Sequence, residues 1–168
     1  MVQAGQIMTA DTINESYPWI MVKHTDQQVV SSSTPQNDVD LWAPLESFST
    51  YEVEMYVSID SSVDAATSND ASFSWAIPSG SIYTARQGQG PSSGMTSVAS
   101  TTMTSPRSYW TNTIIYGTDD LPSAVSERGV VRTGANPGIL QLRWAQLLSN
   151  ANPLTLRAGS VLIVRRVE

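Results

Sequence analysis

The clearest pattern of apolar and polar positions in this chain runs from Thr50 to Ile59. Every second side chain is apolar, and these are Tyr51, Val53, Met55, Val57 and Ile59. Between them stand Glu52, Glu54, Tyr56 and Ser58. Strict alternation over about ten residues is typical of a β-strand with one buried face and one face in water. We therefore predict a long strand here, with Glu52 and Glu54 on its exposed face.

Shorter apolar runs recur along the chain, and turn residues separate them. The further predicted strands are Trp19–Lys23, Asp26–Val30, Val39–Ala43, Ser72–Pro78, Ser81–Arg86, Tyr109–Tyr116 and Val125–Thr133. Ser31–Asp38 has the composition of a turn, and Gln87–Ser105, rich in Gly, Ser and Thr, has no firm pattern. No segment has the apolar spacing of a long amphipathic helix.

The closing segment, Gly138–Val167, contains two more apolar runs joined by a polar connection. Ile139–Trp144 forms the first run and Val161–Val164 the second, which follows the turn Ala158-Gly159-Ser160. We expect both runs to be strands and the C-terminus to be built into the fold. Short strands at such spacing predict an all-β fold, an antiparallel jelly-roll sandwich of roughly eight to ten strands.

Residues 1–18 differ from this pattern and are expected to form a short N-terminal arm ahead of a β-sandwich domain at residues 19–168. The arm is polar, with Ile7, Met8 and Ile13 as its apolar points. Two interpretations stay open for it. The arm docks on another surface, or it is a frayed terminus.

Composition limits the class of protein. With 168 residues the chain is long enough for one domain with a real core. The 24 Ser and 16 Thr raise the alternative of disorder, but apolar residues recur along the whole chain, which favours a folded domain. There is no cysteine, which excludes disulfides and thiolate metal sites.

Charge is unevenly distributed between the two halves of the sequence. Residues 1–84 hold one base, Lys23, and eleven acids, whereas residues 85–168 hold eight arginines and four acids. The halves either pair within one sandwich or meet between copies in an assembly. The total of −6 and a pI near 4.6 argue against general nucleic-acid binding. Residues 1–16 lack the basic and apolar regions of a signal peptide, and no apolar run is long enough to span a membrane, so we expect a soluble protein made in the cytoplasm.

Candidate catalytic chemistry is sparse. His24 is the single histidine, too few for a histidine-based metal site. Glu52 and Glu54 have a spacing that a glycan hydrolase could use, although a charged strand face is the simpler interpretation. Asp60, Asp64 and Asp70 flank one loop and could bind calcium weakly, although they lack the regular spacing of a calcium loop. We therefore expect no catalytic residue, cofactor or metal, and a structural or binding role.

Both ends of the sequence resemble a group of tailed-phage virion proteins. The matching positions in the closing segment are Leu140-Gln141-Leu142, Trp144-Ala145-Gln146, Ser149-Asn150, Ala158-Gly159-Ser160 and Arg165-Arg166-Val167. The matching positions in the first half are Ala4–Asn14, Thr25–Leu45 and Thr50–Glu54. The middle, Gln87–Ser123, matches poorly, and Leu147-Leu148 and Pro153 depart from the group's small polar connection.

This resemblance implies a jelly-roll domain, similar to that of tumour necrosis factor, that assembles as a homotrimer. It implies a capsid decoration (cement) protein, a head fibre or a minor tail protein. For the first of these we expect contacts with the major capsid protein, a location on the capsid exterior, and no direct contact with nucleic acid or membrane. The arm, through Ile7, Met8, Ile13 and Trp19, is expected to reach the capsid or a neighbouring trimer. Tyr109, Trp110 and Arg143 are expected at the trimer interface.

Two other functions stay open. A tail or fibre protein would bind the host surface through the long loops Ser61–Asp70 and Gln87–Ser105. A glycan hydrolase would use Glu52 and Glu54.

Overall fold

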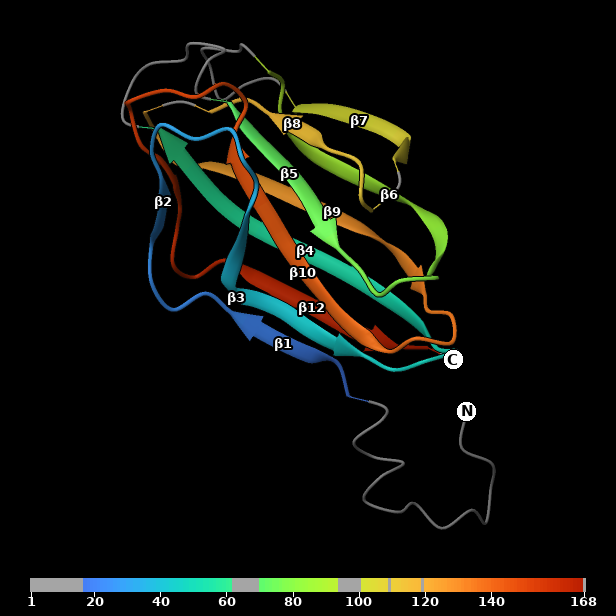
Figure 1. Cartoon of the computed structure of the whole chain (residues 1–168). Coiled ribbons are helices and arrows are strands. Elements are labelled where there is room, and N and C mark those ends of the chain that lie inside the picture. Colours follow the sequence, from blue (N-terminus) through green and yellow to red (C-terminus); the bar gives the residue numbers. More distant parts are fainter. Residues whose placement is uncertain (1–16, 62–69, 94–100, 109, 119, 168) are drawn as a thin grey trace.

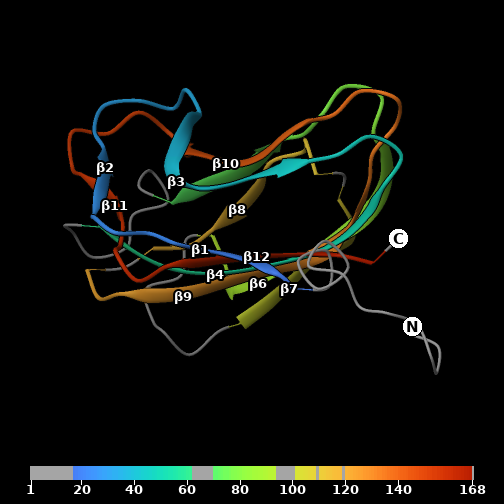
Figure 2. The same ribbon diagram turned by 90° about the horizontal axis from the view of Figure 1, so that it is seen from below.

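The computed structural model describes residues 17–61, 70–93, 101–108, 110–118 and 120–167, with the backbone alone for residues 82–85 and 101–108. All regular elements in these residues are β-strands (Figure 1). The strands form two layers that face each other, as Figure 2 shows along the sandwich. The predicted all-β antiparallel sandwich is confirmed.

The larger sheet contains eight strands. Its main path is β1 (Trp19–Val22), β12 (Val161–Arg166), β4 (Thr50–Ser61), β9 (Ser123–Arg132), β6 (Ile82–Pro91) and β7 (Thr101–Ser108). The short strand β11 (Leu154–Leu156) pairs with the end of β4 and with β2 (Gln27–Val29). Each of these pairings is antiparallel.

The smaller sheet contains four strands in the order β3 (Gln36–Leu45), β10 (Gly138–Gln146), β5 (Ala71–Ala76) and β8 (Ile114–Tyr116). β3 lies at the edge of this sheet, and β1 lies at the edge of the larger one. The two edge strands are neighbours in space, so one side of the sandwich is formed by two strand edges.

The core lies between the layers and follows the alternation of β4. Tyr51, Val53, Met55, Val57 and Ile59 are all buried, as the sequence pattern predicts. Trp75, Trp110 and Trp144 add the largest buried surfaces, and Trp75 packs edge-on against Trp110 with ring centroids 5.5 Å apart. Three of the five tryptophans thus stabilise the core through apolar burial.

An ion pair is also sealed between the layers. Arg86 Nη1 lies 3.1 Å from Glu127 Oε2, and both side chains are fully buried. The Glu127 carboxylate also accepts hydrogen bonds from Trp75 Nε1 at 2.7 Å and Tyr116 Oη at 2.8 Å. Arg86 Nη2 donates to the carbonyls of Phe73 and Asn112 at 3.2 and 2.6 Å. This cluster ties β6 and β9 of one sheet to β5 and β8 of the other.

Several predicted boundaries are wrong. Gln87–Ser105 was expected to lack regular structure, but β6 continues to Pro91 and β7 begins at Thr101. β3 begins at Gln36, inside the predicted turn, and continues through Pro44. Proline is tolerated there because β3 is an edge strand and needs no backbone donor on its outer side. Of the predicted strand Tyr109–Tyr116, only Ile114–Tyr116 is a strand among the described residues, because residues 110–112 form a turn.

Candidate functional site

The strand β1 exposes apolar side chains at the edge of the larger sheet. Its sequence is Trp-Ile-Met-Val, and among the described residues it pairs only with β12. Ile20 is 60% exposed and Val22 40% exposed. Trp19 turns the other way and stacks on Tyr51 with ring centroids 6.0 Å apart. One side of β1 therefore holds the strand to the core, and the other presents apolar surface to solvent.

A groove lies between this strand and β3. It has a volume of about 690 Å³. Apart from His24 and Asp40 its walls are apolar, and they are formed by Pro18–Val22 on one side and by Val39, Trp42 and Pro44 on the other. Val39 is 62% exposed and Trp42 is 42% exposed. We call this the edge groove. Exposed apolar surface of this kind makes the groove a candidate interaction site.

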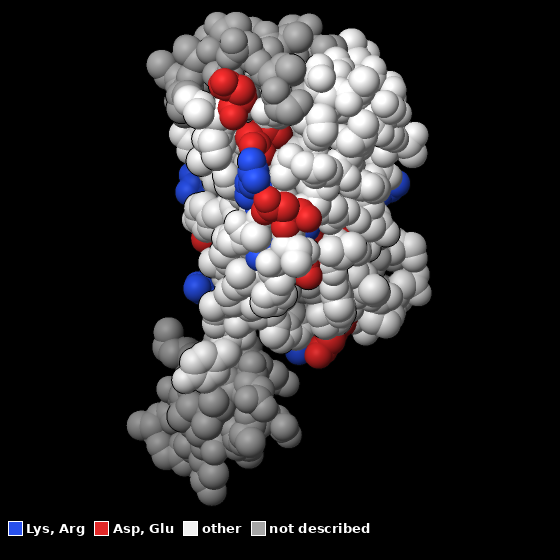
Figure 3. Space-filling model, turned by 90° about the vertical axis from the view of Figure 1, so that its left-hand side faces the viewer, with Lys and Arg blue, Asp and Glu red and all other residues white. Residues whose placement is uncertain are grey.

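Charged side chains avoid most of this part of the surface. Figure 3 views the molecule from the side on which β1, β2 and β3 lie. Acidic and basic side chains form a band from the top of that face to its middle, and the described surface below the band is largely uncharged. Contacts made by the uncharged part would therefore be mainly apolar.

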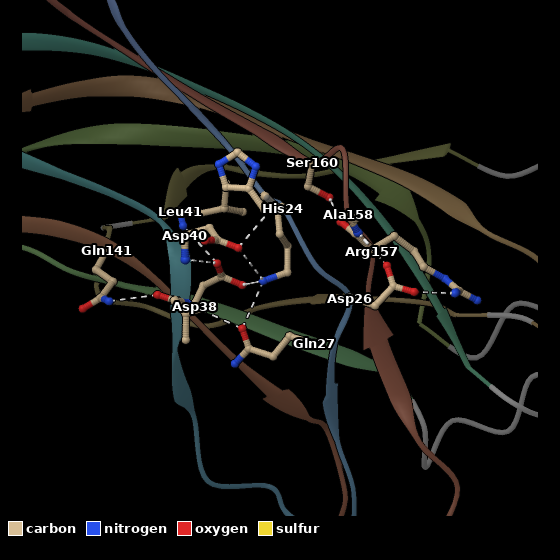
Figure 4. A network of polar contacts seen from close by, with 12 residues as sticks. His24, Asp26, Gln27, Asp38, Asp40, Leu41, Gln141, Arg157, Ala158 and Ser160 are labelled. Atoms are coloured by element: carbon tan, nitrogen blue, oxygen red, sulfur yellow. Dashed lines mark hydrogen bonds and ion pairs between the residues drawn. The ribbon is translucent and has the colours of Figure 1, made fainter.

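A buried polar network holds the two walls of the edge groove together (Figure 4). Lys23, directly after β1, places its Nζ 2.8 Å from Asp38 Oδ2 of β3, and neither side chain is exposed. The same Nζ donates to Gln27 Oε1 at 3.1 Å and lies 3.9 Å from Asp40 Oδ2. The backbone N–H of His24 donates to Asp40 at 3.2 Å. Because these contacts join β1 to β3, the groove is formed before any partner binds.

Asp38 also shapes the wall that β3 contributes. Its Oδ1 accepts hydrogen bonds from the backbone N–H groups of Asp40 and Leu41, at 3.0 and 2.9 Å. At this point the pairing of β3 with β10 shifts register, from Trp42 opposite Gln141 to Asn37 opposite Arg143. The resulting bulge turns Val39 outward into the groove, where strict alternation would have buried it.

A second polar cluster lies beside the first and fastens the turn before β12 (Figure 4). Asp26 accepts hydrogen bonds from the backbone N–H of Ala158 and from Arg157 Nη1, both at 2.8 Å. These two donors, Ala158 first, hold the pKa of the Asp26 carboxyl below its ordinary value. Arg157 Nε donates to Asp60 Oδ1 at 2.9 Å, and Asp60 with Asp26 raises the pKa of Arg157.

The residues predicted to contact the capsid or another subunit have different places in the structure. Ile7, Met8, Ile13 and Tyr109 lie outside the described residues. Trp19 lines the edge groove. Trp110 is fully buried in the core of its own chain, where its Nε1 donates to the Val130 carbonyl, so its side chain has no surface to offer another copy. Arg143 is half-buried on β10, and its Nη2 donates to the Pro35 carbonyl at 3.4 Å.

The carboxylates considered for hydrolase chemistry already have partners on the exposed face of β4. Glu52 pairs with Arg165 Nη1 at 3.4 Å. Glu54 accepts a hydrogen bond from Tyr56 Oη at 3.1 Å, which raises the pKa of Tyr56. Neither carboxylate lines the edge groove.

Of the three aspartates considered as calcium ligands, the two that the structure describes already have partners. Asp60 binds Arg157, and Asp70 accepts a hydrogen bond from the Ser93 hydroxyl, while Asp64 lies outside the described residues. In the described part of the chain, no three acidic, histidine or cysteine side chains group as a metal site. No helix in that part is long and apolar enough to cross a membrane.

Sequence reasoning missed most of the edge groove. It named Trp19 but not Ile20, Val39 or Trp42. One signal was available: Trp19–Val22 has four apolar residues without a charge, which is unusual for a strand with an exposed edge. Nothing in the sequence placed that strand at an edge or next to β3.

Comparisons with known proteins add little to this geometry. The sequence matches no protein family and none of the curated proteins with which it was compared. Two solved structures of infectious bursal disease virus, of the Gx and Gt strains, are similar to 98% of this chain at 10% identity. The TM-scores are 0.21 and 0.24, and the chain spans 43% of each of those chains. Similarity at this level carries no argument about function, which is argued below from the chain itself.

Proposed function

We propose that this chain is a virion structural protein, a homotrimeric capsid decoration (cement) protein of a tailed phage. The observation that carries this proposal is the edge groove, an exposed apolar surface between two sheet edges. A protein with such a surface associates with itself or with a partner, because association removes the apolar side chains from water. The resemblance of both ends of the sequence to tailed-phage virion proteins supplies the virion context.

In this role the trimer binds the major capsid protein on the capsid exterior and bridges neighbouring subunits. Each copy needs only modest contacts, because many copies on one shell add their contributions through multivalency. The buried ion pairs Lys23–Asp38 and Arg86–Glu127 support this role, since a rigid subunit loses little conformational entropy on binding. We assign no catalytic step, no cofactor and no nucleic-acid contact to the chain.

A second candidate function is a tail or fibre protein that binds the host surface. It is favoured by two shallow hollows on the outer face of the larger sheet, with volumes of about 210 and 470 Å³. Tyr56, Gln89 and Ser126 line both hollows, and Tyr56 is 52% exposed. An exposed aromatic ring beside amide and hydroxyl groups has the chemistry of a small polar ligand site.

The number and position of copies in the particle separate the two functions. Quantitative mass spectrometry of purified virions should give on the order of hundreds of copies for a decoration protein, because it coats the whole shell. Electron microscopy of the same particles should place the protein on the capsid exterior. A few tens of copies or fewer, located on the tail, would contradict the proposal and support the second candidate.

A further inference from the structure

The edge of β1 lacks most of the features by which proteins normally protect an exposed strand. Such strands are very short, or they carry lysine, proline, a bulge or an inward-pointing charge, which prevent pairing with another chain. Trp19–Val22 is short, with four residues, and Pro18 directly precedes it, but the strand itself contains no lysine, proline, bulge or inward-pointing charge. Lys23, the nearest base, is buried against Asp38, so its charge does not protect the edge from pairing with another strand. An apolar edge beside an apolar groove is therefore suited to receive an added strand.

The chain itself contains a segment that fits this place. Residues 1–16 precede Tyr17 and Pro18, and Pro18 is part of the groove wall. Their apolar side chains include Ile7, Met8 and Ile13, spaced along a polar sequence. In extended form they would span about 50 Å, at roughly 3.3 Å per residue, whereas the four residues of β1 span about 13 Å. The segment is long enough to reach a groove on another molecule and lie along it.

The residues at the junction favour another copy over the same chain. Folding back along β1 would need a tight turn at Tyr17 and Pro18. The ring of Pro18 disfavours the helical backbone conformation for Tyr17 and keeps that residue extended. Tyr17 is 67% exposed. A tight turn back along β1 is therefore disfavoured, which makes a neighbouring molecule the favoured place for the segment.

We propose that residues 1–16 of one copy lie in the edge groove of the next copy, as an added strand along β1. Such a contact joins two different surfaces, and contacts of this type close into rings when the rotation between copies allows. Three copies, each giving its arm to the next, form the closed trimer. This inference rests on the proposed homotrimer and identifies what holds it together.

Cysteine cross-linking tests this arrangement directly, because the chain has no native cysteine. One cysteine is placed in the arm, as Ile7→Cys, Met8→Cys or Ile13→Cys, and a second in the groove, as Val39→Cys. Val39 is exposed, so this change leaves the core intact. Leu121→Cys, at a residue that is 58% exposed but outside the groove, replaces Val39→Cys in the control. Each full-length protein is treated with a short bismaleimide and separated on a denaturing gel.

The arm-exchange ring predicts a covalent three-chain band for at least one arm position with Val39→Cys, and none with Leu121→Cys. A ladder that continues beyond three chains would mean that arms link separate trimers, and it would overturn the proposal. Single-chain bands at all three arm positions would overturn it as well. The mass of the untreated protein in solution is measured separately. A trimer whose arms do not cross-link refutes the arm exchange alone, whereas a monomer refutes the proposed homotrimer.

Discussion

Lys23 and Asp38 join the edges of the two sheets through an ion pair of 2.8 Å, and both side chains are fully buried. Lys23 follows β1 directly, and Asp38 lies in β3. The contact therefore crosses from one layer to the other at the open side of the sandwich. It fixes the distance between the walls of the edge groove.

Replacing Lys23 by methionine should lower the free energy of unfolding by about 3–5 kcal/mol, because Asp38 is left as a buried charge without its cation. Urea denaturation at neutral pH measures this change. Arg165→Met is the matched control. Its pair with Glu52 is about half exposed, so its loss should cost about 0–1 kcal/mol. Equal effects of the two variants would contradict the role given to Lys23.

Glu127→Gln should destabilise the protein to a similar degree. The change removes the charge that compensates Arg86 in the core, while the shape of the side chain is kept. We expect a loss of about 3–5 kcal/mol in the free energy of unfolding. Thermal unfolding followed by tryptophan fluorescence measures it, since Trp75 donates to the same carboxylate. A variant as stable as the parent would show that the pair does not stabilise the sandwich.

Ile20→Asp should weaken self-association and leave the fold of each chain intact. Ile20 is 60% exposed, so its replacement changes little within one chain, but the new charge must be buried when the groove is covered. Sedimentation velocity over a dilution series should show dissociation at higher protein concentration than for the parent. Leu121→Asp, at an equally exposed apolar residue outside the groove, should not shift dissociation. The same shift in both variants would argue against the groove as the interface.

Asp26→Asn should reduce stability in a pH-dependent way. The pKa of Asp26 is lowered in the folded chain, so the carboxylate contributes stability above its ordinary pKa of 3.8 and loses that contribution as the pH falls through the lowered value. The melting temperature of the variant should therefore lie below that of the parent at neutral pH, and the two should converge in acid. A difference that persists at about pH 2 would contradict this sign.

The sequence predicted the fold class well because alternation reports burial directly. The inward face of β4, from Tyr51 to Ile59, is as expected, since one face of that strand meets the core and the other meets water. β11 was missed because Leu154–Leu156 is only three residues long and is buried throughout. A pattern with period two cannot be recognised in so short a run.

The candidate site was harder to predict, for reasons visible at β3. Alternation in Val39–Ala43 would place Val39 with Leu41 and Ala43 inside, but the bulge held by Asp38 places it outside. Trp110 illustrates the opposite error, since a tryptophan taken for a surface anchor belongs to the core. Both outcomes depend on contacts between segments far apart in the sequence. The local sequence pattern does not reveal these long-range contacts.

The mass of the purified protein in solution tests the central claim most directly. The exposed edge groove is interpreted as a surface that joins copies of this chain into a closed trimer. Light scattering at micromolar concentration should therefore give about three times the chain mass of 18.2 kDa. A mass of one chain under these conditions would contradict the account.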